Sequence, residues 1–194
     1  KSFIFSTGYK AGKIKQYFIK KGSQRYYFSH EKIPLGTGGA VNNGKKFIKS
    51  RLFLVLNGDS FCKVDFSGFL KFHSRKKAVF SMVLVKNMNN CDFGSVKLEK
   101  TGRVSNFKEK GIPLAGSNLL NAGIYLFSSR IFSLMPRKKR FSLEYDLLPL
   151  LVKKRLFGFR TQGPLIDIGT KQGLAAAGVY FKKYGGFLSK GVGS

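Results

Sequence analysis

The stretch Leu52-Phe53-Leu54-Val55-Leu56-Asn57-Gly58-Asp59 decides the fold, because an apolar run of strand length ends there in a turn that carries a carboxylate. Such a run predicts a buried strand. Parallel α/β sheets bind ligands beyond the carboxyl ends of their strands, and an acid at that place can hold a hard cation such as Mg²⁺. The alternative is that Asp59 only caps a turn or the next helix.

A second apolar segment has the same form. Pro164-Leu165-Ile166 runs into Asp167-Ile168-Gly169-Thr170, so that a second carboxylate also follows a strand. We expect Asp59 and Asp167 to converge on one metal site, although they lie far apart in the chain. The capping interpretation remains the alternative for Asp167 as well.

Length and composition indicate one globular domain over residues 1–194. The chain has 194 residues, of which 43% are hydrophobic, and this is enough for one apolar core. It contains no apolar run of the roughly 20 residues that span a bilayer, and its start lacks the features of a signal peptide. These observations favour a cytoplasmic protein without membrane insertion.

Cysteine and histidine give no sign of a metal centre. Cys62 and Cys91 show neither metal-ligand spacing nor a disulfide framework, so we expect reduced thiols. His30 and His73 have no partner at ligand spacing. We interpret His73 as a helix-surface residue and assign neither histidine a catalytic role.

The charge balance raises the question of nucleic acid, since 36 Lys and Arg face 9 Asp and Glu, for a net charge of +27. The basic residues are scattered in short clusters, and no helix-turn-helix, zinc-finger or RNA-binding aromatic motif is present. We therefore expect no specific nucleic-acid partner. A non-enzymatic protein that binds polyanions through its charge remains one alternative.

Apolar stretches of strand length alternate with segments of helical periodicity. Predicted strands are residues 3–6, 25–28, 51–56, 78–85, 122–127 and 157–160, and predicted helices are residues 11–19, 40–49, 66–75, 144–152 and 172–184. Two short strands around Thr101-Gly102 are interpreted as a hairpin. The pattern predicts an α/β, Rossmann-like three-layer sandwich with a mixed, mostly parallel sheet covered by helices on both faces.

Eight short motifs follow one another along the chain. They are Thr7-Gly8-Tyr9-Lys10-Ala11, Glu31-Lys32-Ile33-Pro34-Leu35-Gly36-Thr37-Gly38-Gly39-Ala40, Asn57-Gly58-Asp59, Phe93-Gly94-Ser95-Val96, Phe107-Lys108-Glu109-Lys110, Asn121-Ala122-Gly123-Ile124-Tyr125, Ser142-Leu143-Glu144 and Asp167-Ile168-Gly169-Thr170. In this order they resemble the sugar-1-phosphate nucleotidylyltransferases, which have the nucleotide-diphospho-sugar transferase fold. The chain is most similar to the mannose-1-phosphate and D-glycero-D-manno-heptose 1-phosphate guanylyltransferase branch.

The resemblance implies a role for each motif. The implied nucleotide-binding residues are Leu35, Gly36, Thr37, Gly38, Gly39, Asn57 and Gly58; the implied sugar-phosphate-binding residues are Gly94, Glu109, Lys110, Asn121, Gly123 and Glu144; and the implied catalytic residues are Asp59, Lys110 and Asp167, with Asp59 and Asp167 as Mg²⁺ ligands. Glycines would let the backbone approach a flat base, and lysine would supply a point charge to a phosphate.

Each implied role has a structural alternative. The glycine segment can be a simple turn, and Glu109-Lys110 can be a solvated surface pair. Asn121 can be a turn residue, and Glu144 can be a charge in the first turn of a helix. We interpret the aromatic residues as core.

The chain also departs from the family pattern. The family begins with a strand that runs into a glycine-rich loop with an Arg and, further on, a Pro-Lys pair, and this sequence contains no equivalent. That loop would cradle the triphosphate with backbone N–H groups. We therefore expect an N-terminally truncated domain with unpaired strand edges and without turnover on its own.

The resemblance implies transfer of a nucleotidyl group, with GTP the expected donor, to a mannose-type or heptose-type sugar 1-phosphate. Pyrophosphate would leave, Mg²⁺ would serve as cofactor, and the product would feed surface glycan synthesis. The expected partners are the nucleoside triphosphate and the sugar 1-phosphate, with homo-oligomerisation left open. An inactive or regulatory homologue that binds a sugar nucleotide without turnover is the second alternative.

Overall fold

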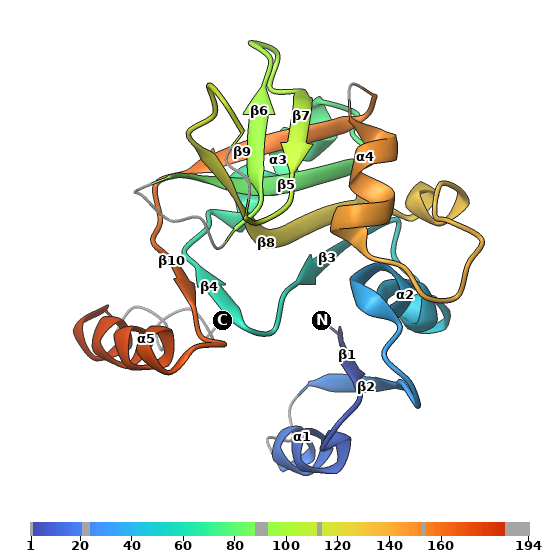
Figure 1. Cartoon of the computed structure of the whole chain (residues 1–194). Coiled ribbons are helices and arrows are strands. Elements are labelled where there is room, and N and C mark those ends of the chain that lie inside the picture. Colours follow the sequence, from blue (N-terminus) through green and yellow to red (C-terminus); the bar gives the residue numbers. More distant parts are fainter. Residues whose placement is uncertain (1, 21–23, 88–92, 112–113, 153, 185–194) are drawn as a thin grey trace.

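The computed structural model describes residues 2–20, 24–87, 93–111, 114–152 and 154–184 (Figure 1). In chain order the elements are β1 (Ser2–Thr7), α1 (Ala11–Ile19), β2 (Arg25–His30), α2 (Gly36–Asn43), the 3-10 helix η1 (Gly44–Phe47), β3 (Leu52–Leu56), β4 (Ser60–Cys62), α3 (Phe66–Arg75), β5 (Phe80–Lys86), β6 (Ser95–Leu98), β7 (Val104–Lys108), β8 (Leu119–Ser128), the 3-10 helix η2 (Ser129–Ser133), the π-helical turn η3 (Leu143–Leu147), α4 (Leu148–Leu151), β9 (Leu156–Thr161), β10 (Leu165–Asp167) and α5 (Lys171–Tyr184).

The main sheet is organised around β8. Its strands lie in the order β7-β6-β8-β5-β9, and β3 pairs with a further part of β8. β8 runs antiparallel to β3, β5 and β6, whereas β5 and β9 are parallel. The predicted α/β class with a mixed sheet is confirmed. The pairs are mostly antiparallel and not mostly parallel, because the central strand opposes each of its three neighbours.

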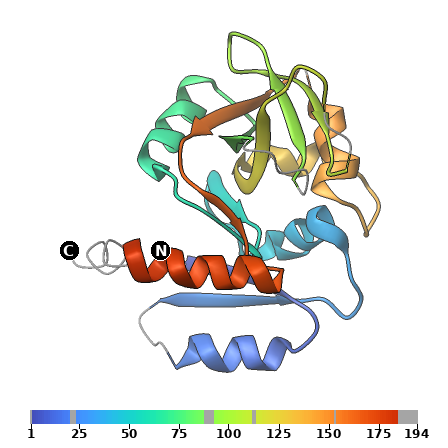
Figure 2. The same ribbon diagram turned by 60° about the vertical axis from the view of Figure 1, so that its left-hand side comes forward.

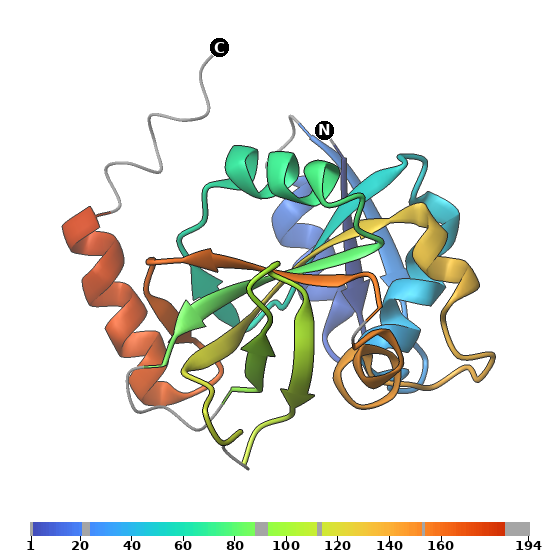
Figure 3. The same ribbon diagram turned by 90° about the horizontal axis from the view of Figure 1, so that it is seen from above.

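Apolar side chains on both faces of this sheet form two cores. Along β5, Phe80, Met82 and Leu84 enter one core, and Val83 and Val85 enter the other, as the two-residue period of a strand requires. The first core is covered by η3 and α4 and the second by α3. Figure 3 shows α3 on one side of the sheet and α4 on the other, which agrees with the predicted layers.

Strand β3 differs from the prediction of a buried central strand. It pairs only with β8 among the described residues, and Leu54 and Leu56 are 44% and 54% exposed. β1 and β2 form a separate parallel pair that lies with α1 below the main sheet (Figures 1 and 2). In the described part of the chain, β1 and β3 each pair with one strand only.

Helix prediction succeeds where the signals are local. α1 and α3 begin and end as predicted, and Asp65 caps α3 by accepting a hydrogen bond from the Gly68 backbone N–H. α2 instead begins at Gly36, four residues before the predicted start. The N–H groups of Gly38 and Gly39 both donate to the carbonyl of Phe141, so the acceptor for the helix start comes from a distant segment.

Two further segments differ from their predictions: the helix over residues 144–152 and the strand that ends at Asp167. The helical segment is a π-helical turn followed by the short α4, and Ser142 caps it by accepting from the N–H groups of Glu144 and Tyr145. β10 pairs antiparallel with β4 in a small sheet of its own. None of the described helices is long and apolar enough to cross a membrane.

His73 is buried and does not lie on the helix surface as predicted. Its Nδ1 lies 2.8 Å from the hydroxyl oxygen of Ser81 on β5, and its Nε2 is buried without a hydrogen-bond partner among the described residues. Burial lowers the pKa of His73 from 6.5 to about 4. Cys62 is a buried free thiol, as expected, and Cys91 lies outside the described residues.

The buried His73 predicts a loss of stability in mild acid. The unfolded chain takes up a proton below pH 6.5 and the folded chain only near pH 4. The neutral form therefore stabilises the fold above pH 6.5, and this contribution is lost as the pH falls towards 4. We expect His73 to account for about 2 kcal/mol of the decrease in unfolding free energy between pH 7 and pH 5.

Urea unfolding of the wild type and of His73→Gln at both pH values measures this contribution. The glutamine variant should lose that part of the pH dependence. An equal pH dependence in the two proteins would contradict the buried neutral histidine.

Candidate active site

The two aspartates that end apolar segments lie side by side. β4 and β10 pair with Ser60 opposite Asp167, and the Ile168 N–H donates to the Asp59 carbonyl at 2.7 Å. A methyl group added at Gly169 would lie 3.1 Å from Asp167 Oδ1 and 4.0 Å from Asp59 Oδ2. The two carboxylates are therefore within the roughly 8 Å that a Mg²⁺ and a bridging phosphate can span.

The donor set fits Mg²⁺ held jointly by protein and substrate. No group of three or more His, Cys, Asp or Glu side chains in the described part of the chain could enclose a metal by itself. Mg²⁺ keeps several waters and commonly binds through one or two carboxylates together with substrate phosphates. Asp59 and Asp167 supply such a pair, and their role as metal ligands remains a prediction.

A second cluster gathers around Glu144. Its Oε1 accepts a hydrogen bond from the Tyr125 hydroxyl at 3.0 Å, and its Oε2 accepts from Ser142 at 2.7 Å and from Thr37 at 2.5 Å. The amide Nδ2 of Asn121 donates to the Tyr125 hydroxyl oxygen at 2.8 Å. The side chain of Glu144 is thus held from β8, α2 and the segment before η3.

Glu109 lies next to this cluster with an unused acceptor. Its Oε1 accepts from the Lys110 backbone N–H at 3.1 Å, while its Oε2 is buried without a partner among the described residues. Burial raises the pKa of Glu109; the charge of Glu144 also raises it, while the Lys110 hydrogen bond opposes both. A buried acceptor without a donor is costly, so this oxygen suits a hydroxyl donor of a bound ligand.

The predicted sugar-phosphate residues therefore meet at the carboxyl end of β7 and the start of β8. Asn121 is tied to Gly94, whose carbonyl accepts from the Asn121 N–H, and to Gly123, whose N–H donates to Asn121 Oδ1. Lys110 is exposed directly after Glu109. The structure brings these residues together with Glu144, while their contact with a sugar phosphate remains a prediction.

The glycine-rich segment from Leu35 to Gly39 packs against the segment around Phe141. A side chain at Gly38 would collide with the Phe141 ring, and one at Gly39 would lie 2.7 Å from the Lys139 carbonyl oxygen. The Phe141 N–H donates to the Leu35 carbonyl at 2.9 Å. The close approach that these glycines permit is therefore to another part of the chain, and contact with a base stays a prediction.

Asn57 joins the two clusters. Gly123 has a φ of +68°, and a side chain there would lie 2.7 Å from Asn57 Nδ2. The Asn57 N–H donates to the Gly123 carbonyl at 2.9 Å. Because Asn57 precedes Asp59 by two residues, the aspartate pair is linked directly to the Asn121–Gly123 segment. Gly58 is exposed, with open space around it.

Sequence reasoning missed two members of this site. The interpretation of aromatic residues as core holds for the Tyr125 ring, which is fully buried, but its hydroxyl enters the Glu144 cluster. Ser142 belongs to one of the eight motifs, and the resemblance implies no role for it. The spacing of Tyr125 could have indicated its role. It follows Asn121 by four residues in a predicted strand, and side chains at that spacing lie on the same face.

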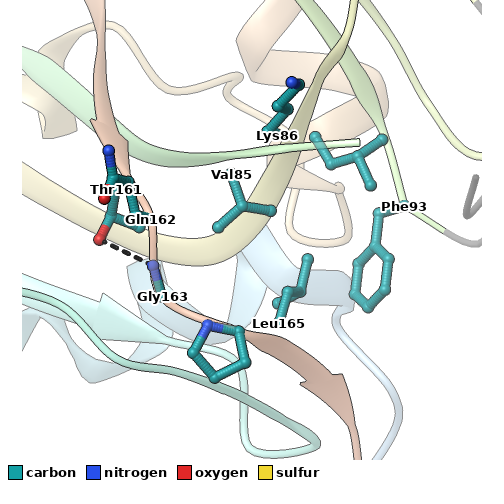
Figure 4. Close-up of a pocket in the computed structure, with 9 residues that line it drawn as sticks. Val85, Lys86, Phe93, Thr161, Gln162, Gly163 and Leu165 are labelled. Atoms are coloured by element: carbon teal, nitrogen blue, oxygen red, sulfur yellow. Dashed lines mark hydrogen bonds between the residues drawn. The ribbon is translucent and has the colours of Figure 1, made fainter. Parts of the chain in front are cut away.

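A pocket of about 570 Å³ lies at the carboxyl ends of β5 and β9 (Figure 4). Val85, Leu120, Thr161 and Leu165 are among its lining residues. Leu120 faces the opposite side of β8 from Asn121, and no predicted site residue lines this pocket. It is therefore separate from the Glu144 cluster.

The sequence matches the family described as nucleotidyl transferase over residues 3–182. The chain therefore belongs to the nucleotidyl transferase family, which confirms the expected family and the expected class of enzyme. It is 33% identical over 172 residues to D-glycero-alpha-D-manno-heptose 1-phosphate guanylyltransferase of Aneurinibacillus thermoaerophilus, covering 86% of this chain and 72% of the relative. The Campylobacter jejuni enzyme of the same name is 34% identical, with 89% and 75% covered.

Solved structures agree with the sequence relatives. HddC from Yersinia pseudotuberculosis superposes with a TM-score of 0.81 at 31% identity, covering 93% of this chain and 78% of that one. The same protein complexed with GMP-PN gives 0.79 at 32% identity, with 92% and 77% covered. These likenesses confirm the predicted nucleotide-diphospho-sugar transferase fold.

Because Gly38 packs against the Phe141 ring, even one added methyl group at position 38 is expected to lower the free energy of unfolding. Gly38→Ala should lower the free energy of unfolding by about 1–3 kcal/mol, because the new side chain meets the Phe141 ring. Gly12→Ala is the matched control in α1, where nothing lies within 4 Å and a gain of about 1 kcal/mol is expected from helix propensity. Chemical denaturation measures both. Equal effects of the two substitutions would contradict the packing role of Gly38.

Proposed function

We propose that residues 1–194 supply the metal-binding carboxylates and the sugar-phosphate site for transfer of a guanylyl group from GTP to a heptose-type or mannose-type sugar 1-phosphate, with release of pyrophosphate. The observation that carries this proposal is the meeting of the Asp59–Asp167 pair with the Glu109–Glu144 cluster through Asn57. An acid pair suits a metal on phosphates, and half-buried carboxylates suit the hydroxyls of a sugar. The similarity to heptose 1-phosphate guanylyltransferases supports this choice of substrates.

In this mechanism a phosphate oxygen of the sugar 1-phosphate attacks the α-phosphate of the nucleotide in line, without a covalent enzyme intermediate. Lys110 attracts and orients the sugar phosphate as a point charge. Glu109, Glu144 and Asn121 bind the sugar hydroxyls and fix the attacking group. Asp59 and Asp167 would hold Mg²⁺, which when bound neutralises charge on the phosphates.

GTP is proposed as the donor because HddC, similar to this chain over most of its length, is known in complex with GMP-PN. The product would serve the synthesis of surface glycans. The proposal also includes a cytoplasmic location and leaves homo-oligomerisation open. A regulatory homologue without turnover is the second candidate.

The central experiment measures pyrophosphate release from GTP, with ATP and UTP as competing donors, in the presence of Mg²⁺ and heptose 1-phosphate or mannose 1-phosphate. We expect turnover when the family's N-terminal strand and glycine-rich loop are joined to residues 1–194, and none from residues 1–194 without them. Asp59→Asn and Asp167→Asn should each reduce turnover at least 100-fold. Asp65→Asn, a change at the cap of α3, should not.

Three results would contradict parts of this proposal. Turnover by the short chain would show that another segment holds the triphosphate. Turnover with ATP or UTP in preference to GTP would refute the donor assignment. Binding of both substrates by the extended protein without pyrophosphate release would favour the regulatory candidate.

Because Lys110 is exposed, its removal is expected to lower the affinity for the sugar phosphate without lowering the stability of the fold. Lys110→Ala should weaken binding of mannose 1-phosphate about 10-fold or more, since a charged hydrogen-bond donor is lost, with little change in melting temperature. Lys100→Ala is the matched control, because Lys100 is an exposed lysine at the turn between β6 and β7. Calorimetric titration and thermal melts separate the two effects. A variant that unfolds would show that Lys110 is structural.

A further inference from the structure

We propose that Thr37 and Tyr125 are positioning residues of the sugar site, which act by holding the carboxylate of Glu144. Thr37 lies in the glycine-rich segment, so this inference moves it from the nucleotide side of the site to the sugar side. The inference rests on the proposed function, because Glu144 is taken to bind the sugar.

The first support is the number of donors on one carboxylate. Tyr125 donates to Oε1 of Glu144, and Thr37 and Ser142 donate to Oε2. An ionised carboxylate is an acceptor only, and each of these hydroxyls has one proton to donate. We call this set of three hydroxyls around Glu144 the hydroxyl clamp.

The second support is that the single hydroxyl proton of Thr37 is already donated to Glu144. Its hydroxyl donates to Glu144 at 2.5 Å and also accepts from the Leu143 backbone N–H at 2.8 Å. A threonine hydroxyl has a single donor. While Thr37 holds Glu144, it therefore cannot donate a hydrogen bond to a nucleotide.

The third support is that the Tyr125 hydroxyl is fixed from both sides. Its ring is fully buried and packs edge-on against Phe80, with ring centroids 5.4 Å apart. Its hydroxyl oxygen accepts from Asn121 Nδ2 and its proton goes to Glu144. Tyr125 thus ties two predicted sugar-binding side chains to each other at a fixed separation.

These contacts form one continuous chain of hydrogen bonds from Asn121 through Tyr125 and Glu144 to Thr37. The residues come from β8, η3 and α2, which are far apart in sequence. A preorganised carboxylate binds a ligand hydroxyl without first losing its own freedom. Loss of one clamp hydroxyl should therefore weaken sugar binding although no direct sugar contact is removed.

Calorimetric titration of mannose 1-phosphate tests the clamp. Thr37→Val keeps the shape of the side chain and removes the hydroxyl, and Tyr125→Phe keeps the buried ring. Each should weaken mannose 1-phosphate binding about 10-fold, the loss of one hydrogen bond to a charged group, while GTP binding stays within twofold. Thr37→Ser restores the hydroxyl and should restore sugar-phosphate affinity.

Thr101→Val is the matched control. The Thr101 hydroxyl donates to Glu99 on the surface at 3.3 Å and accepts from the Arg103 N–H. It therefore repeats the Thr–Glu pair away from the site. This variant should bind mannose 1-phosphate as the wild type does.

The order of the Glu144 side chain gives a readout that needs no substrate. NMR with ¹³C-labelled glutamate should show a single ordered Glu144 side chain in the wild type and an averaged one in Thr37→Val and Tyr125→Phe. Loss of GTP affinity in Thr37→Val, or an unchanged Glu144 signal in both variants, would overturn the inference. If the wild type binds no sugar 1-phosphate, the proposed function fails, while the Glu144 signal still decides whether the clamp exists.

Discussion

The structure depends on the backbone hydrogen bonds of β8, which pairs with β3, β5 and β6 along its ten residues. Every residue from Leu119 to Phe127 is buried, so this strand cannot shift in register without moving apolar side chains out of both cores. Its alternation also places Asn121, Gly123 and Tyr125 on one face. The same constraint that orders the sheet therefore sets the separation of the polar groups in the candidate site.

Local signals in the sequence were sufficient for much of the fold and for part of the site. Asp65 caps α3 through a side chain three residues from its partner, and the apolar runs before Asp59 and Asp167 place both acids at strand ends. Features that depend on distant segments were not predicted. The start of α2 needs the carbonyl of Phe141, and the burial of His73 needs β5 to pack against α3. No local pattern around either residue contains that information.

The contrast between the charge of the chain and the charge of its site has a physical meaning. The chain carries a net +27, yet five of its nine acids fall in the motifs that make up the site. A positive surface raises the local concentration of phosphate-bearing ligands. In the proposed function the acids would then act at short range, on a metal ion or on sugar hydroxyls. Attraction and recognition would thus depend largely on different residues.

The left-handed glycine on β8 has a consequence for how this site can change over time. Gly123 leaves the space that the Asn57 side chain occupies, and Asn57 is two residues from Asp59. A larger residue at position 123 would push on the loop that carries the acid as well as on the strand that carries Asn121. A smaller residue at position 57 would not remove this obstacle, because a side chain at a φ of +68° is strained whatever the space around it. Position 123 is therefore expected to remain glycine.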